Sequence, residues 1–149
     1  MLRRGLKSAV VIGVGLAVSV GVVGAQFPSV GEHYDTSRTQ ALNGRVSSVV
    51  YNPQRTYVVL AVASAAGQEE QWAVAGRNFS ELGWTPKSAP VKLGDAISFV
   101  VYRAKPGAKV ASTVPADHTA LLEIATAGRL VHGTEITLPN GSKLSFGER

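Results

Sequence analysis

Short apolar runs that recur at close spacing, each bounded by a turn signal, constrain the fold of this chain most. The run Thr56–Ala63 (TYVVLAVA) is β-branched and apolar on both faces, which is typical of a central strand. Asn52-Pro53-Gln54-Arg55 precedes it as a turn, because proline restricts φ and asparagine tolerates turn geometry. Gln40–Tyr51, before that turn, has the spacing of a strand, and Gly44 predicts a bend or bulge within it.

Four further strand-like runs follow along the chain. Residues 71–75 and 96–103 alternate between two faces, as a half-buried strand does. Near the C-terminus, Asn140-Gly141 separates two more short strand-like runs at residues 135–138 and 142–146. Asn-Gly between two such runs is the strongest short-range signal of a β-hairpin.

One short helix is predicted between these strands. Asn78 can accept a backbone hydrogen bond as the N-cap, Glu81 follows as a capping-box partner, and Gly83 offers a left-handed C-cap. Trp84 comes directly after the cap and is expected to pack onto the sheet. Residues 116–131 suit a helical turn as well as a short strand, and periodicity cannot separate the two.

These elements predict a mostly β domain built as a small closed or half-closed antiparallel barrel. We expect it to occupy residues 40–149, after an extended lead-in at residues 26–39. The chain contains no cysteine, which excludes disulfides, thiolate metal sites and cysteine nucleophiles. A domain of this length buries roughly two thirds of its unfolded surface, so it can hold a core without cross-links.

The first 25 residues have the layout of a secretory signal peptide, expected as a hydrophobic helix. A basic head comes first (Arg3, Arg4 and Lys7). Residues 8–23 carry no charge, and Val23-Gly24-Ala25 supplies small residues for a cut before Gln26. The mature chain is therefore expected to be periplasmic or secreted.

An uncleaved membrane anchor is the alternative interpretation of this segment. A membrane-spanning helix needs about 20 consecutive apolar residues. The uncharged run at residues 8–30 reaches that length only if Gln26, Pro28 and Ser29 are included. The remainder of the chain is expected outside the cytoplasm in both interpretations, because the basic cluster Arg3, Arg4 and Lys7 precedes the apolar run and no basic cluster directly follows it. Only the anchored form would be membrane-bound, facing the periplasm.

The charge of the mature chain argues against a nucleic-acid partner. The full chain has a formal net charge of +5, and removal of the three basic residues in the signal peptide leaves about +2. A nucleic-acid-binding protein needs clustered cations. The nearest cluster is Arg103, Lys105 and Lys109 around Pro106-Gly107, which is typical of a solvated turn.

A series of short motifs extends over residues 33–144. They are His33-Tyr34-Asp35, Gly44-Arg45-Val46, Asn52-Pro53-Gln54, Trp72, Leu82-Gly83-Trp84, Gly94-Asp95 and Asn140-Gly141. In this order they resemble a family of small exported proteins of unknown function from Gram-negative bacteria, which has an N-terminal His segment, an Asn-Pro-His turn and a Leu-x-x-Gly-Trp motif. The family usually has paired histidines and a histidine in its turn, where this chain has Glu32 and Gln54.

The resemblance implies a barrel of the oligonucleotide/oligosaccharide-binding (OB) type, in agreement with the strand pattern. The expected fold class is therefore mostly β: a small antiparallel OB-like barrel with one short helix, preceded by the N-terminal signal helix.

No enzyme activity is expected, because neither G-x-S-x-G nor S-x-x-K before a helix occurs. We expect an exported binding or accessory module of the bacterial cell envelope, without cofactor, whose partner is an envelope protein or a small ligand. The candidate binding residues are Tyr51, Asn52, Tyr57 and Trp84. Tyr51 and Tyr57 are the aromatic residues most expected to be exposed, although aromatic residues in strands are more often part of the core.

Two alternative functions remain open. The first is a periplasmic metal-binding protein that holds Cu or Zn with His33 and Asp35, which share a face of an extended segment. His118 or His132 would complete that site. The second is an N-terminally anchored accessory subunit of a membrane complex.

Overall fold

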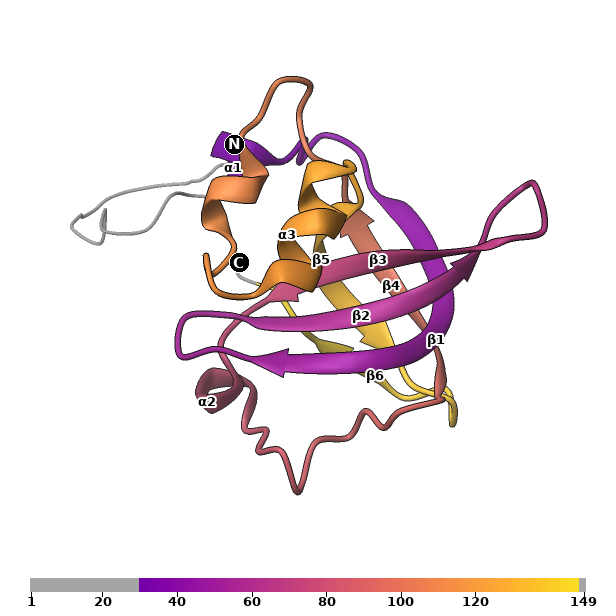
Figure 1. Cartoon of the computed structure of the whole chain (residues 1–149). Coiled ribbons are helices and arrows are strands. Elements are labelled where there is room, and N and C mark those ends of the chain that lie inside the picture. The colour runs from indigo at the N-terminus through magenta and orange to yellow at the C-terminus, as the bar shows by residue number, and fades with distance from the viewer. Residues whose placement is uncertain (1–29, 148–149) are drawn as a thin grey trace, which may run out of the picture.

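The strands form one sheet that closes on itself as a barrel (Figure 1). The computed structural model describes residues 30–147, so the predicted signal peptide lies outside the described residues. In chain order the strands are β1 (Gln40–Tyr51), β2 (Thr56–Ala63), β3 (Glu69–Gly76), β4 (Ala96–Tyr102), β5 (Leu130–Thr137) and β6 (Lys143–Ser145). The sheet order is β3-β2-β1-β4-β5-β6, and β3 also pairs with β5. Strands β1 to β5 therefore make the barrel, and β6 extends β5 as a hairpin.

The barrel is mixed, where an antiparallel one was expected. Ala73–Ala75 of β3 pair in parallel with residues 130–132 of β5, and all other strand pairs are antiparallel. A parallel pair needs a long crossover connection, and residues 77–129, which include β4, provide it between β3 and β5. The predicted fold class, a mostly β OB-like barrel, is confirmed with this one parallel pairing, but the described residues contain several short helices where one was expected.

The barrel interior is filled by one face of each strand. In β4 the buried side chains are Ile97, Phe99 and Val101, the alternate residues of the strand. Their neighbours in the core come from β1 and β2, and also from Trp84, which packs onto the sheet as predicted. Five residues at the start of β2, 56–60, are buried in succession, so the strand has both faces covered.

Four short helical segments surround the barrel within residues 30–147. They are α1 (Val30–His33), α2 (Phe79–Leu82), the 3₁₀ helix η1 (Val110–Thr113) and α3 (Thr119–Thr126). The predicted caps of α2 are confirmed: Asn78 Oδ1 accepts from the Glu81 amide at 2.8 Å, and Gly83 has φ of 73°. No helix of the described region is long and apolar enough to cross a membrane.

Residues 116–131, where helix and strand could not be separated, contain both. Helix α3 ends at Thr126, and β5 begins at Leu130 after a left-handed Gly128. Helix α3 crosses over β3 (Figure 1, orange). Its buried residues Leu121 and Ile124 belong to a second apolar cluster with outward-facing residues of β2, β3 and β5. This second layer covers the outer face of β2 and β3.

The lead-in was expected to be extended throughout, but its first described residues form the single turn α1. After this turn, Tyr34 pairs with Ala104 in an isolated antiparallel bridge. The Asp35 amide donates to the Arg103 carbonyl at 2.9 Å, and the Lys105 amide donates to the His33 carbonyl at 2.8 Å. These hydrogen bonds attach the lead-in to the start of the β4–β5 connection.

Gly44 was expected to mark a bend or bulge within β1, and the shift in register of β1 lies just after it, between Val46 and Ser48. Gly44 itself serves a close backbone approach: a Cβ atom there would lie 2.7 Å from the Ala61 carbonyl oxygen. Strand β1 pairs with both β2 and β4, so it bends strongly around this point.

Phe146 closes the barrel interior beside β5. Its side chain is fully buried, with ring centroids 5.1 Å from Phe99 and 5.6 Å from Trp84. Gly133 of β5 makes room for this packing, since a Cβ atom there would lie 2.5 Å from Val74 Cγ1 and 3.0 Å from the Phe146 ring.

We therefore predict that Gly133→Ala lowers the free energy of unfolding by about 1–3 kcal/mol, the usual cost of overpacking a core. Urea unfolding followed by tryptophan fluorescence measures the change. Gly31→Ala is the matched control, because nothing lies within 4 Å of a Cβ atom at that position. Equal stability of the two variants would contradict this account of the barrel closure.

Candidate functional site

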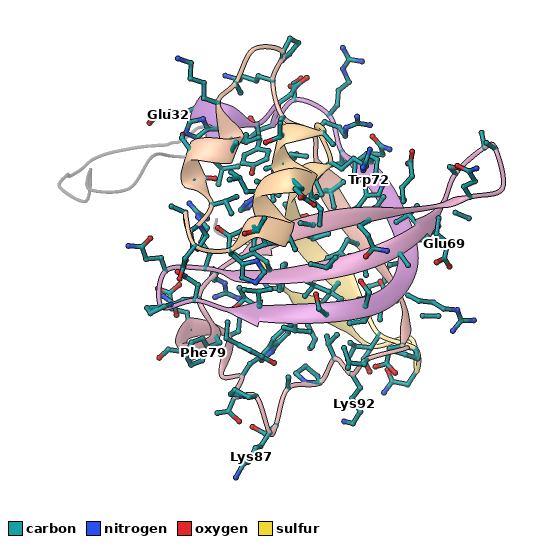
Figure 2. All side chains as sticks on the ribbon, in the orientation of Figure 1. Glu32, Glu69, Trp72, Phe79, Lys87 and Lys92 are labelled. Carbon is teal, nitrogen blue, oxygen red and sulfur yellow. The ribbon has the colours of Figure 1, made fainter. Side chains whose placement is uncertain are left out.

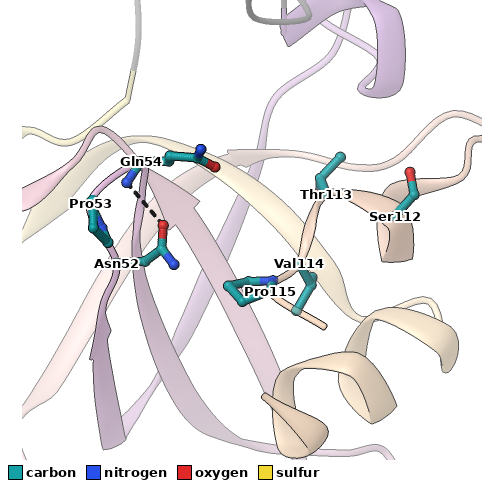
Figure 3. A pocket seen from close by; sticks show the side chains of 7 residues that line it. All are labelled: Asn52, Pro53, Gln54, Ser112, Thr113, Val114 and Pro115. Atoms are coloured by element: carbon teal, nitrogen blue, oxygen red, sulfur yellow. Dashed lines mark hydrogen bonds between the residues drawn. The ribbon is translucent and has the colours of Figure 1, made fainter. Parts of the chain in front are cut away.

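A cleft opens at the rim of the barrel between the β1–β2 turn and the segment that follows η1 (Figure 3). Its volume is about 410 Å³, within the range of small-ligand sites. We call it the rim cleft and define it by its lining residues: Asn52, Pro53, Gln54, Ser112, Thr113, Val114 and Pro115.

The first wall of the rim cleft is a tight two-residue turn. The Asn52 amide donates to the Arg55 carbonyl at 3.1 Å, and the Arg55 amide donates to the Asn52 carbonyl at 3.2 Å. Asn52 Oδ1 also accepts from the Gln54 amide at 2.9 Å (Figure 3, dashed line). This is the Asx-type bond that favours asparagine in turns. The Gln54 side chain is exposed and makes no hydrogen bond with any residue in the described range.

The second wall is fixed by hydrogen bonds within and behind η1. Ser112 Oγ donates to the Lys109 carbonyl and Thr113 Oγ1 donates to the Val110 carbonyl, both at 2.6 Å. Tyr57 Oη donates to the Thr113 carbonyl at 3.2 Å, which connects this wall to β2. The wall is therefore held against the barrel by a buried hydroxyl.

Burial raises the pKa of Tyr57, and the nearby Arg55 partly opposes that shift. The phenol therefore keeps its proton, and with it the hydrogen bond to Thr113, throughout the neutral pH range. The second wall does not depend on the titration of this group under ordinary conditions.

The chemistry of the rim cleft is that of a binding site. None of its seven lining side chains ionises near neutral pH. Its two hydroxyl groups donate to backbone carbonyls and have no general base as partner. The lining instead offers amide donors, amide and hydroxyl acceptors, and the apolar surfaces of two prolines and a valine.

Of the four predicted binding residues, Asn52 lines the rim cleft and Tyr57 supports it from behind. The expected exposure of Tyr57 is wrong: it is 1% exposed, because η1 and α3 cover its strand. Tyr51 is half-buried and packs edge-on against Phe79, with ring centroids 5.5 Å apart. Trp84 is buried in the barrel interior against Phe146 and does not line the rim cleft.

The second wall of the rim cleft, residues 112–115, was not predicted as part of a site. Its sequence, Ser-Thr-Val-Pro, reads as an ordinary polar loop. The one available signal was Pro115, because a proline restricts the residue before it, here Val114, to an extended conformation.

The four predicted metal ligands are not assembled into one site. Asp35 accepts hydrogen bonds from the Ser37 amide and hydroxyl, which lower its pKa. His118 caps α3 and accepts from the Leu121 amide through Nδ1. His132 is buried in β5, 5.6 Å from the ring of Tyr34. Across the part of the chain that the structure covers, no three His, Asp or Glu side chains are grouped as metal ligands.

Trp72, the other tryptophan of the sheet, lies at a different place on the barrel (Figure 2). It is half-buried, and the Arg103 guanidinium lies 5.0 Å from its ring centroid. Its indole N–H donates to a Glu70 carboxylate oxygen at 3.4 Å. The polar edge and one face of this indole are therefore already occupied by side chains of the protein itself.

We predict that Tyr57→Phe loosens the second wall of the rim cleft and lowers the free energy of unfolding by about 1 kcal/mol, because one hydrogen bond is lost. Hydrogen–deuterium exchange should become faster at the amides of residues 112–114. Tyr51→Phe is the control, since the Tyr51 hydroxyl makes no hydrogen bond with residues 30–147. Unchanged exchange at residues 112–114 in Tyr57→Phe would show that this hydrogen bond does not hold the wall.

Comparison with known proteins places the chain in a family without assigning it an activity. No curated protein and no solved structure matches the chain. A protein family of unknown function, DUF6152, matches residues 15–113, more than half of the chain. The matched range contains strands β1 to β4 and the first wall of the rim cleft, and it ends within the second wall, at Thr113. The chain therefore belongs to the DUF6152 family, a family of unknown function.

Proposed function

We propose that this protein is an exported, non-catalytic binding module of the bacterial cell envelope, which takes its ligand or partner in the rim cleft. The observation that carries the proposal is the position of the cleft. OB-type barrels bind through the β1–β2 loop, the β4–β5 loop and the outer face of β2 and β3. Here the first two of these elements converge on one cavity.

The third binding element of such barrels is not accessible in this protein. Tyr57 and Val59 of β2, with Ala73 and Ala75 of β3, are buried in the cluster under η1 and α3. A ligand cannot reach this face while the β4–β5 connection covers it. The rim between the two loops is the part of the usual binding surface that stays open, which supports the rim cleft as the site.

The composition of the lining supports binding without catalysis. Hydrolysis and group transfer need a nucleophile with a base, a carboxylate pair or a metal. The rim cleft contains two hydroxyl groups and two amides, and its hydroxyl protons are directed to the Lys109 and Val110 carbonyls. A ligand held there would be recognised and left unchanged.

Export is supported by the layout of the first 25 residues. We propose a periplasmic or secreted location. An N-terminally anchored form would present the same domain to the periplasm, because the basic head stays on the cytoplasmic side of the membrane in both interpretations.

We predict that the mature protein begins at Gln26. Intact-mass spectrometry of the protein recovered from the envelope of its bacterial host should give the mass of residues 26–149. A variant with Ala25 replaced, Ala25→Arg, should accumulate uncleaved, because a large charged residue does not fit a small-residue cleavage site. Recovery of the wild-type chain at full length in the membrane fraction would replace cleavage with the anchored form.

We also predict that the rim cleft is occupied in the cell. In the full chain, Gln54→p-benzoylphenylalanine places a photo-crosslinker at the exposed edge of the cleft, where it reacts with C–H bonds of any bound molecule. Irradiation of intact cells should add mass to this variant. The matched control is the same replacement of Gln68, an exposed glutamine in the β2–β3 turn. Equal labelling at both positions, or none at position 54, would reject the rim cleft as the binding site.

A further inference from the structure

We infer that the second half of β1, residues 47–51, is a docking edge where an extended, uncharged segment of a partner protein adds to the sheet as a further strand. This edge is not part of the lining of the rim cleft, so the inference goes beyond the proposed function and does not depend on it. It follows from the register of β1, from the lack of charge along its second half, and from the position of α2 beside it.

The register of β1 directs the backbone groups of alternate residues away from β2. At the β1–β2 turn, Asn52 and Arg55 exchange both backbone hydrogen bonds. In an antiparallel pair, residues that exchange both bonds alternate along each strand with residues that exchange none. The regular register that leads up to this turn therefore leaves Val49 and Tyr51 with their N–H and C=O groups on the side opposite β2.

On that side, β1 has no partner strand after Val46. Strand β4 pairs with the first half of β1, and then the Val46 amide donates to the Asp95 carbonyl at 2.9 Å. The Val46 carbonyl accepts from the Gly94 amide at 2.8 Å. In the described part of the chain, no hydrogen bond reaches the outward backbone groups of Val49 or Tyr51. The edge therefore offers a donor and an acceptor at each of two alternate residues, which is the pattern that an extended backbone complements.

Two other open strand edges are protected by arginine side chains. In β6, the Ser145 carbonyl accepts from Arg77 Nη2 at 3.4 Å. In β3, the Gln71 carbonyl accepts from Arg129 Nε at 3.1 Å. Charged side chains at an edge are a common means of preventing strand addition. Residues 46–54 (VSSVVYNPQ) contain no charged residue, so the second half of β1 lacks this protection.

The side chains beside the open edge determine what kind of segment fits. Val49 and Tyr51 are half-buried against the barrel interior, and Val50 is half-buried against the outer apolar cluster. An added strand would place alternate side chains next to these two apolar surfaces. Pairs of β-branched and aromatic residues across strands stabilise a sheet. The partner segment is therefore uncharged and rich in β-branched or aromatic residues.

The position of α2 favours a single added strand over a second copy of the domain. Phe79 of α2 packs edge-on against Tyr51, with ring centroids 5.5 Å apart. Helix α2 and the chain that follows it extend past this edge of β1 (Figure 1). A second barrel would need the same space for its own sheet. One extended segment needs only the spacing of about 4.8 Å between neighbouring strands.

The experiment is an NMR titration of the ¹⁵N-labelled exported protein with the uncharged peptide acetyl-Thr-Val-Thr-Val-Thr-amide. The amide signals of Val49 and Tyr51 should shift in a saturable manner. Their exchange with deuterium should slow by about fivefold or more at saturation, because a hydrogen-bonded amide exchanges only when it opens. The same peptide with every backbone amide N-methylated keeps the side chains but cannot donate a backbone hydrogen bond, so it should not bind.

Two variants test the edge itself. Ser48→Lys places a charge beside the open edge and should weaken binding of the peptide by about fivefold or more. Ser142→Lys is the matched control, because it adds the same charge to the exposed β5–β6 hairpin and should leave the affinity unchanged. Val49→Pro removes an outward N–H without breaking a bond to β2, as proline permits at an open edge, and should abolish binding. Unchanged tryptophan fluorescence of the variants shows that the barrel is kept.

Failure of the peptide to slow exchange at Val49 and Tyr51 at millimolar concentration overturns the inference. Equal binding of the N-methylated peptide, or equal weakening by Ser48→Lys and Ser142→Lys, also overturns it. A dimer that Ser48→Lys converts to a monomer would assign the edge to a second copy instead. The proposed function is decided separately, by the photo-crosslinker at position 54.

Discussion

Three residues of parallel pairing between β3 and β5 close the barrel. Parallel strands cannot be joined by a tight turn, and the crossover from β3 to β5 runs through residues 77–129, with β4 inside it. Strands β4 and β5 are antiparallel neighbours, with Tyr102 paired to His132, yet residues 103–129 of this crossover separate them and carry both η1 and α3. The second wall of the rim cleft belongs to this part of the crossover.

The same crossover determines which surfaces remain available. It covers the outer face of β2 and β3 with apolar side chains, so a face that half-solvated barrels leave open becomes a second core. Tyr57 belongs to both parts of this arrangement: its ring is buried in the cluster, and its hydroxyl holds the Thr113 carbonyl at the edge of the cleft. Stability and the shape of the candidate site therefore depend on the same residue.

Local chemistry was predictable from the sequence, and long-range pairing was not. The turn at Asn52, the caps of α2 and the Asn140-Gly141 hairpin each depend on residues within four positions of one another. The parallel β3–β5 contact joins residues more than fifty positions apart, and the hydrophobic periodicity of each strand does not indicate which distant strand it pairs with. The burial of Tyr57 and the role of residues 112–115 escaped prediction for the same reason, because both depend on where the crossover lies.

The family match also bears on how large the folding unit is. The match ends at Thr113, before α3 and β5, yet β4 and β3 cannot close into a barrel without β5 between them. Phe146, which fills the interior beside Trp84, comes from still later in the chain. Removing residues after Thr113 would expose the buried sides of both apolar clusters at once. The closed barrel and the complete rim cleft therefore require the C-terminal segment as much as the matched one.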